Sequence, residues 1–200
     1  MKKGLMKVVA LAAASVMAVA ALAGCGSSDK LIMGTNAAFP PFEYTTSQGL
    51  VGEFDGIDVA IANKIAENVG KELQIEDMEF DGLVASVSTG KVDMVVAGMT
   101  ATDERKQSVD FSDPYYKTGF VMAVAKDSKI TKLEQLRGKR VAIKTGTAAG
   151  EYAMSLKDKY GFTTVTFDDS DNMYNDVVNG NSVACFEDVP VMQYAIKTGT

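Results

Sequence analysis

Residues 92–116 read VDMVVAGMTATDERKQSVDFSDPYY, and the fold can be predicted outward from this stretch. The apolar run at residues 92–97 predicts a buried strand that ends at Gly98. Thr102, Asp103 and Glu104, which favour a helix start, come shortly after it. A strand followed by a helix start is typical of α/β proteins, and the N–H groups of that helix start favour anions.

Strand-like and helix-like segments alternate along the rest of the chain. The patterns predict strands at residues 31–33, 73–75, 119–125, 139–143, 163–167 and 182–186, and helices at 57–69, 83–87, 133–136, 147–160, 172–178 and 189–197. Strands separated by helices imply parallel sheets with helices on both faces. The segments divide near Asp113 and Pro114, so we expect two α/β lobes at residues 31–116 and 117–200. Ligands of such folds bind in a cleft beyond the carboxyl ends of the strands.

Charge and composition exclude several classes of function. The formal net charge is −6, and because residues 1–24 carry three lysines and no acid, the remainder carries −9. A protein with this much negative charge binds nucleic acid poorly, because a basic surface is required to neutralise the phosphates. The sequence has no histidine, which excludes Ser–His and Cys–His catalytic groups and histidine-ligated metal sites. We therefore expect no nucleic-acid partner, no metal and no cofactor.

The amino-terminal segment has the features of an export signal. Residues 1–7 are basic, and residues 8–23 are apolar except for Ser15. Sixteen such residues are few for a bilayer span and usual for a signal peptide. We expect the signal peptide at residues 1–24; a membrane anchor that is retained is the alternative.

The apolar run ends in Leu-Ala-Gly-Cys at residues 22–25, which resembles the lipobox of bacterial lipoproteins. The resemblance implies that Cys25 receives a diacylglycerol, and that residues 25–30 form a lipidated tether on the outer face of the cell membrane. An ordinary signal peptide without lipidation is the alternative. Once Cys25 is assigned to the anchor, Cys185 remains as a free thiol, for which we expect a buried and inert position.

Several separated motifs resemble one family. They read GTNAAFPPFEY at residues 34–44, FDGL at 80–83, GMTATDERK at 98–106, VDFSDPYY at 109–116, KTGT at 144–147 and EDVP at 187–190. In this order they resemble the polar amino-acid-binding proteins of ABC importers (bacterial solute-binding family 3), above all those that bind glutamine. The resemblance implies a two-lobed clamshell of the type II periplasmic-binding-protein class. Members of the family continue past the position of Thr200, so we expect an incomplete second lobe and return segment.

The resemblance assigns a ligand carboxylate to Arg105. A guanidinium makes two parallel charge-assisted hydrogen bonds to a carboxylate, which a lysine cannot reproduce. The hydroxyl and N–H of Thr100, and the N–H groups of Thr147 and Ala148 at a helix start, are placed to bind the same carboxylate. Ala148 stands where glutamine binders have glycine. A solvated surface arginine and a plain turn at Gly98 and Thr100 are the alternatives.

The ligand ammonium is assigned to the Gly98 carbonyl and to Asp188. Asp188 could equally be the N-cap of the helix that begins near Val189. Phe39 and Phe80 are expected to enclose the aliphatic part of the ligand, although aromatic side chains in general are more often part of a core.

The side chain of the ligand is assigned to Asn36, Lys144 and Glu187. Asn36 replaces an aspartate that is common in glutamine binders, and Glu187 replaces a histidine. The alternative is that all three are solvated polar residues. These departures leave the identity of the amino acid open.

We therefore expect an extracytoplasmic lipoprotein that captures a polar amino acid, resembling glutamine, and delivers it to an ABC permease. It is expected to be a binding protein and not an enzyme, and closure of the lobes over the ligand would be its mechanism. One alternative is a dehydratase acting on a cyclohexadienyl substrate such as arogenate, for which Glu187 is the evident acid or base. The other is a ligand-sensing domain.

Overall fold

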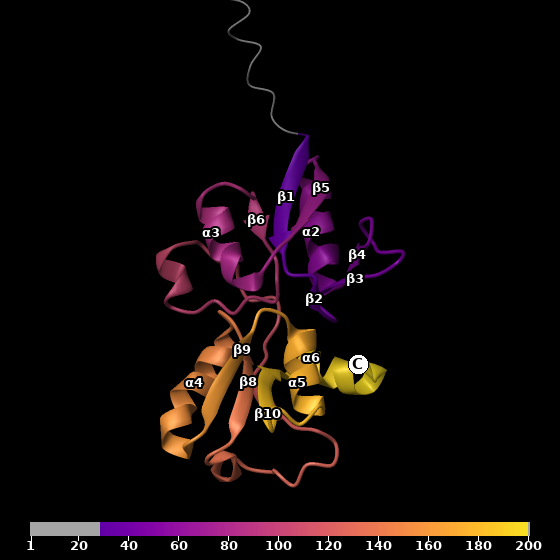
Figure 1. The fold of residues 1–200 in the computed structure, drawn as a ribbon. Helices are drawn as coiled ribbons and strands as arrows, with labels where there is room; N and C mark the ends of the chain where they lie inside the picture. Colours follow the sequence, from indigo (N-terminus) through magenta and orange to yellow (C-terminus); the bar gives the residue numbers. More distant parts are fainter. Residues whose placement is uncertain (1–28, 200) are drawn as a thin grey trace, which may run out of the picture.

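The fold consists of two α/β lobes, one above the other in Figure 1. The structure is a computed structural model that describes residues 29–199. The predicted signal peptide and Cys25 lie outside the described residues. Within residues 29–199, no helix has both the length and the apolar character that crossing a bilayer requires.

The first lobe is built on a parallel sheet in the order β5-β1-β6, formed by β5 (Glu72–Asp77), β1 (Lys30–Thr35) and β6 (Met94–Val95). Helices α2 (Ile57–Asn68) and α3 (Leu83–Ser88) pack against it. The core contains Met33 of β1, Ala62 and Ala66 of α2, and Leu73 of β5. These helices agree closely with the sequence prediction.

A small antiparallel meander beside this sheet was not predicted. It consists of β2 (Ala38–Phe39), β3 (Glu43–Thr45) and β4 (Phe54–Asp55). Gly56 then connects β4 to α2 with a φ of 123°, and a Cβ at this position would collide with the carbonyl oxygen of Phe42. The N–H of Asp58 donates to that same oxygen at 2.8 Å, so the meander is bonded directly to the start of α2.

The second lobe is built on a four-stranded sheet in the order β7-β10-β8-β9. Its strands are β7 (Phe120–Ala123), β8 (Arg140–Lys144), β9 (Thr163–Phe167) and β10 (Ala184–Asp188). Strands β10, β8 and β9 run parallel, whereas β7 runs antiparallel to β10. The prediction of purely parallel sheets is therefore wrong for β7.

Helices cover both faces of the second sheet, as predicted. They are α4 (Ala148–Tyr160), α5 (Ser170–Val178) and α6 (Val189–Thr198). Alternation along β8 sends Val141 and Ile143 into the cluster that contains α4, and Ala142 into the cluster that contains α5. Cys185 is a free thiol in that second cluster, and burial raises its pKa to about 12, so it is buried and unreactive as predicted.

Two predicted elements next to the cleft are shorter in the structure. Of the predicted strand at residues 92–97, only Met94 and Val95 form strand β6 beside β1. Beyond them, the Val96 carbonyl accepts the Thr35 hydroxyl at 2.8 Å. The predicted helix start at Thr102 is a single 3-10 turn (Arg105–Gln107). The residue at which the lobes divide, near 116, stays a prediction.

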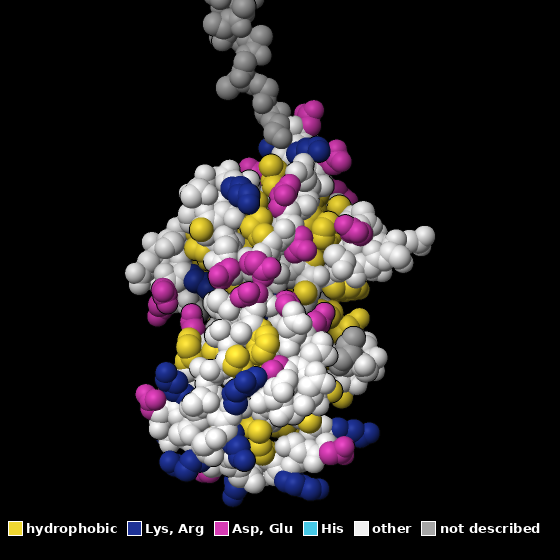
Figure 2. All heavy atoms as spheres, viewed as in Figure 1, with side chains coloured by type: hydrophobic (Ala, Val, Ile, Leu, Met, Phe, Trp, Pro, Cys, Tyr) yellow, Lys and Arg dark blue, Asp and Glu magenta, His cyan; other side chains and the backbone are white. Residues whose placement is uncertain are grey.

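Charge is distributed unequally between the lobes. Residues 31–116 carry ten more acidic than basic side chains, whereas residues 117–200 carry one more basic than acidic. Figure 2 shows acidic side chains over much of the upper lobe and basic side chains toward the far end of the lower one. The acidity of the protein is therefore a property of its first lobe.

Candidate functional site

The structure brings all eleven predicted ligand-binding residues together around one pocket between the lobes. They are Asn36, Phe39, Phe80, Gly98, Thr100, Arg105, Lys144, Thr147, Ala148, Glu187 and Asp188. The first six belong to the first lobe and the other five to the second. The cavity volume is only about 20 Å³. A site that encloses a small molecule usually measures ~300–1,000 Å³, so ligand entry requires the lobes or the lining side chains to move.

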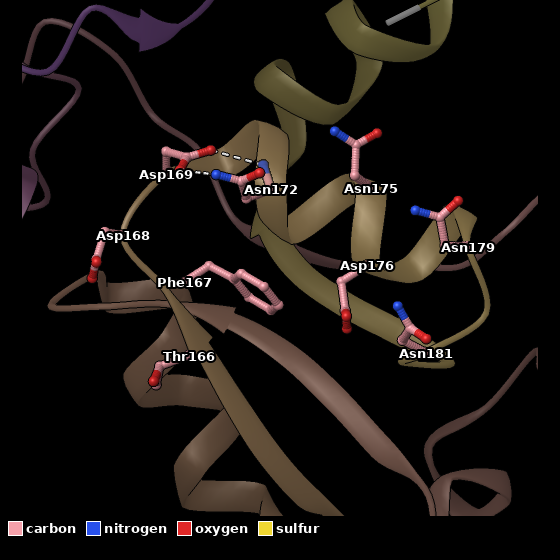
Figure 3. Close-up of a pocket in the computed structure, with 9 residues that line it drawn as sticks. All are labelled: Thr166, Phe167, Asp168, Asp169, Asn172, Asn175, Asp176, Asn179 and Asn181. Atoms are coloured by element: carbon pink, nitrogen blue, oxygen red, sulfur yellow. Dashed lines mark hydrogen bonds between the residues drawn. The ribbon is translucent and has the colours of Figure 1, made fainter.

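A larger hollow of about 390 Å³ lies elsewhere, between the end of β9 and α5 (Figure 3). Its carboxylates already have partners. Asp169 accepts the N–H of Asn172 at 2.7 Å as the N-cap of α5, and Asp176 pairs with Arg140 at 3.0 Å. Asp168 accepts the hydroxyl of Thr145 at 3.2 Å. These residues stabilise the second lobe, and we do not consider this groove the functional site.

Arg105 reaches from the first lobe to the second. Its Nη1 donates to the Thr100 carbonyl at 2.7 Å and its Nη2 donates to the Gly146 carbonyl at 2.8 Å. The guanidinium carbon lies 5.4 Å from the centre of the Phe80 ring. Partial burial lowers the pKa of Arg105, which nevertheless remains a cation. The alternative of a solvated surface arginine is therefore wrong.

Lys144 and Asn36 form a second contact across the pocket. The Lys144 ammonium donates to Asn36 Oδ1 at 2.6 Å, and the Asn36 amide donates to the Met78 carbonyl at 3.0 Å. The ammonium also lies 5.8 Å from the ring centres of both Phe39 and Phe80. Burial lowers the pKa of Lys144, and the nearby Glu187 opposes that shift. Both residues are buried, so the solvated alternative is wrong for them.

Glu187 is buried and fully bonded. Its Oε2 accepts the Tyr174 hydroxyl at 2.7 Å and the Ser170 hydroxyl at 3.4 Å, and its Oε1 accepts the N–H of Asp188 at 2.9 Å. Burial raises its pKa, and the hydrogen bond from Tyr174 is the strongest of the effects that oppose this. The solvated alternative is therefore wrong for Glu187 as well.

Asp188 is the residue of this pocket with an unmet bonding requirement. Its Oδ1 is buried and has no hydrogen-bond partner. Burial first, and the charge of Glu187 second, raise its pKa from 3.8 to about 7. Asp188 does precede α6, but its side chain makes no cap bond. Pro190 occupies the second helical position and offers no N–H to such a cap.

The start of α4 lines the second-lobe side of the pocket. Thr147 is the N-cap, and its hydroxyl oxygen accepts the N–H of Gly150 at 3.1 Å and donates to the Lys144 carbonyl at 2.9 Å. The first N–H groups of a helix have no acceptor within the helix, so those near Ala148 are available to an anion.

Gly98 has a backbone conformation that other residues adopt rarely. Its φ is 53°, and a Cβ would lie 2.8 Å from Cε1 of Phe39. The Gly98 N–H donates to Asp58 Oδ2 at 2.6 Å. Asp58 was not among the predicted site residues, although it is an acid on the buried face of a helix otherwise lined by apolar residues.

Residues 31–188 match bacterial extracellular solute-binding proteins, family 3. The chain belongs to this family. It is 41% identical over 152 residues to the arginine-binding extracellular protein ArtP of Bacillus subtilis (strain 168), covering 72% of this chain and 58% of that protein. It is 32% identical over 176 residues to the ABC transporter arginine-binding protein 1 of Escherichia coli (strain K12), covering 88% of this chain and 70% of that protein.

The fold of this family 3 protein is confirmed by solved structures. An ancestral arginine-binding protein bound to arginine superposes with a TM-score of 0.79 at 33% identity, covering 86% of this chain and 76% of that one. The chain therefore has the α/β periplasmic-binding-protein fold that the sequence predicted. It spans somewhat more than half the length of the B. subtilis relative.

The lobes of this solute-binding protein are closed on each other. The Arg105–Gly146 and Lys144–Asn36 hydrogen bonds cross the pocket, and Val191 of α6 packs against Phe39 and Phe42. The rings of Tyr44 and Tyr194 also meet across the lobes. Opening the pocket therefore separates these charge-assisted and apolar contacts.

Replacing Asp188 is expected to stabilise the protein in a pH-dependent way. Folding raises the pKa of this acid from 3.8 to about 7, so ionisation opposes folding above pH 7, and this penalty disappears as the pH falls toward 4. Asp188→Asn should raise the free energy of unfolding by about 2–4 kcal/mol at pH 8 and by little at pH 4. Urea unfolding at both pH values measures this. Asp171→Asn, at an exposed position on α5, is the control, and equal effects of Asp188→Asn at both pH values would contradict the pKa assignment.

Proposed function

We propose that this protein captures a free polar α-amino acid between its lobes and delivers it to the permease of an ABC importer. One observation carries the proposal: a buried acceptor without a partner, Oδ1 of Asp188, lies in the same pocket as the Arg105 guanidinium. A free amino acid supplies an ammonium for Asp188 and a carboxylate for Arg105. The names of the relatives, an arginine-binding protein and a component of an ABC transporter, support the same role.

The carboxylate is held from both lobes in this proposal. It binds the Arg105 guanidinium in place of the Gly146 carbonyl, and it also meets Thr100 of the first lobe and the start of α4 in the second. The ammonium lies between the Gly98 carbonyl and Asp188. Each charged group of the ligand thus has a partner on both lobes only when the lobes are closed, so binding shifts the equilibrium toward the closed form.

The side chain of the ligand extends toward Asn36 and Lys144. The relatives named for arginine make arginine the first candidate. The buried ammonium of Lys144, enclosed by two aromatic rings, instead favours a neutral side chain such as that of glutamine, because two cations in one subsite repel. We therefore propose the class of polar amino acids with a long side chain, within which Lys144 sets the preference between arginine and glutamine.

The bonding of Glu187 argues against an enzyme. A general acid or base must reach the substrate with an oxygen that is free to exchange a proton. Both carboxylate oxygens of Glu187 already accept hydrogen bonds from the protein. A binding role without covalent chemistry is therefore the better supported proposal.

Amino-acid binding can be tested with a thermal shift scan of the purified protein against the twenty amino acids, followed by calorimetry of those that raise the midpoint. We expect a shift with arginine, glutamine or both. Arg105→Ala should abolish it, and Arg105→Lys should lose most of it because the bidentate contact is lost. Arg137→Ala, at an exposed position outside the pocket, is the control and should keep it. A cooperative transition that no amino acid shifts would contradict the proposal.

The role of Lys144 can be tested by comparing two ligands. Lys144→Met removes the cation and keeps a long apolar side chain. The ratio of arginine affinity to glutamine affinity should rise by roughly tenfold or more, since a like charge in the subsite has been removed. Calorimetric dissociation constants for both ligands measure the ratio. An unchanged ratio would mean that the ligand side chain does not reach Lys144.

We further propose that a lipid on Cys25 anchors the protein to the outer face of the membrane. The lipobox motif supports this, and the B. subtilis relative is named as extracellular. Cys25→Ala should move the protein, expressed with its first 24 residues, from the membrane fraction to the soluble fraction or the medium. Cys185→Ala is the control and should leave the distribution unchanged. Finding Cys25→Ala still in the membrane fraction would favour a retained helical anchor.

A further inference from the structure

Three polar side chains that the proposed function does not use meet beneath Gly98. Glu43 comes from β3, Asp58 from the first turn of α2, and Tyr115 from the segment that leads into the second lobe. Glu43 is 1% exposed and Asp58 is 0% exposed. Buried carboxyl groups are costly unless they are bonded. The two acids differ in this respect, because Asp58 is bonded whereas Oε2 of Glu43 is buried without a hydrogen-bond partner.

Asp58 is the centre of this group. Its Oδ2 accepts the Gly98 N–H at 2.6 Å, and the Tyr115 hydroxyl lies 2.8 Å from Oδ1 and 2.9 Å from Oδ2. Asp58 thus contacts both the residue whose carbonyl is assigned to the ligand ammonium and the segment between the lobes. Next along that segment, Tyr116 makes an edge contact with Phe42, which stacks on Phe39 of the pocket.

The surroundings of Glu43 and Asp58 shift the pKa values of these two carboxyls through different contacts. Burial first and Asp58 second raise the pKa of Glu43 well above its usual value, Asp77 adds to the effect, and Lys144 opposes it. Burial also raises the pKa of Asp58, but hydrogen bonds from Gly98, Tyr115 and Glu43 all lower it. Because like charges this close cannot both ionise readily, the two carboxyls titrate as a coupled pair, and each one raises the cost of ionising the other.

We propose that Asp58 is a positioning residue for the ammonium subsite: it holds the Gly98 backbone in place, and through Tyr115 it connects that subsite to the segment joining the lobes. The proposal rests on the proposed function, because it assigns the ligand ammonium to Gly98. Glu43 acts through Asp58, the carboxyl that it lies beside.

Gly98 needs a partner to hold its backbone because glycine has more conformational freedom than any other residue. A glycine at a φ of 53° has no side chain to restrict it, and a single short hydrogen bond to its N–H restricts the direction of its carbonyl.

The test uses single substitutions in the full protein and two measurements, the dissociation constant of the best amino-acid ligand and the NMR chemical shift of the Gly98 amide proton. A short bond to a carboxylate moves this proton far downfield. Asp58→Asn should weaken binding by roughly 10- to 100-fold and move the Gly98 signal upfield, as expected for a lost hydrogen bond to a charged group. Tyr115→Phe removes only a hydroxyl and should weaken binding several-fold. It also serves as the test if Asp58→Asn does not fold.

Glu43→Gln distinguishes the roles of the two carboxyls, because it changes Glu43 and leaves in place the Asp58 carboxyl that bonds Gly98 and Tyr115. It should weaken binding less than Asp58→Asn does and leave the Gly98 signal downfield. Glu67→Gln, which removes an exposed acid from the same helix, is the matched control and should change neither measurement.

Three outcomes would overturn the proposal: wild-type affinity in both Asp58→Asn and Tyr115→Phe, an unmoved Gly98 signal in Asp58→Asn, or a larger loss of affinity in Glu43→Gln than in Asp58→Asn. A wild-type protein that binds no amino acid would contradict the proposed function and the ammonium subsite together. In that case the Gly98 signal still reports whether Asp58 holds this backbone.

Discussion

The interlobe pocket is governed by the requirement that a charge removed from water must find a partner. Arg105 meets it with two backbone carbonyls, Lys144 with Asn36, and Glu187 with Tyr174 and its own neighbour in the chain. The Arg105–Gly146 and Lys144–Asn36 bonds join the two lobes, whereas Glu187 is bonded within the second lobe. For Arg105 and Lys144, closure of the lobes therefore also compensates a charge.

Asp188 differs from these pocket residues because one of its carboxylate oxygens has no partner in the protein. An acid with an unpartnered buried oxygen reduces the stability of the folded protein, and in the proposed function the ligand ammonium supplies the missing partner. Asp58 shows the opposite arrangement, since its oxygens are bonded to Gly98 and Tyr115. The Asp188 oxygen is thus the one that we propose for ligand recognition, whereas Asp58 is bonded into the protein.

Much of the fold could be predicted because its elements carry local signals. The apolar spacing of α2, the strand β9 and the Thr147 cap of α4 are readable within a short window of sequence. The short strand β6, the antiparallel direction of β7 and the β2–β4 meander could not be predicted in the same way. Each depends on which distant segment lies alongside, as the Thr35 hydroxyl shows where it binds the Val96 carbonyl.

The sequence by itself determined the two α/β halves, the family and the set of residues that line the pocket, because motifs and periodicity are local in the chain. Only the tertiary structure decided which charges face each other. Asp58 and Tyr115 are 57 positions apart, and Lys144 and Asn36 are 108 positions apart. Burial and the direction of a pKa shift arise from such contacts, and no local pattern encodes them, since they exist only once the lobes have packed.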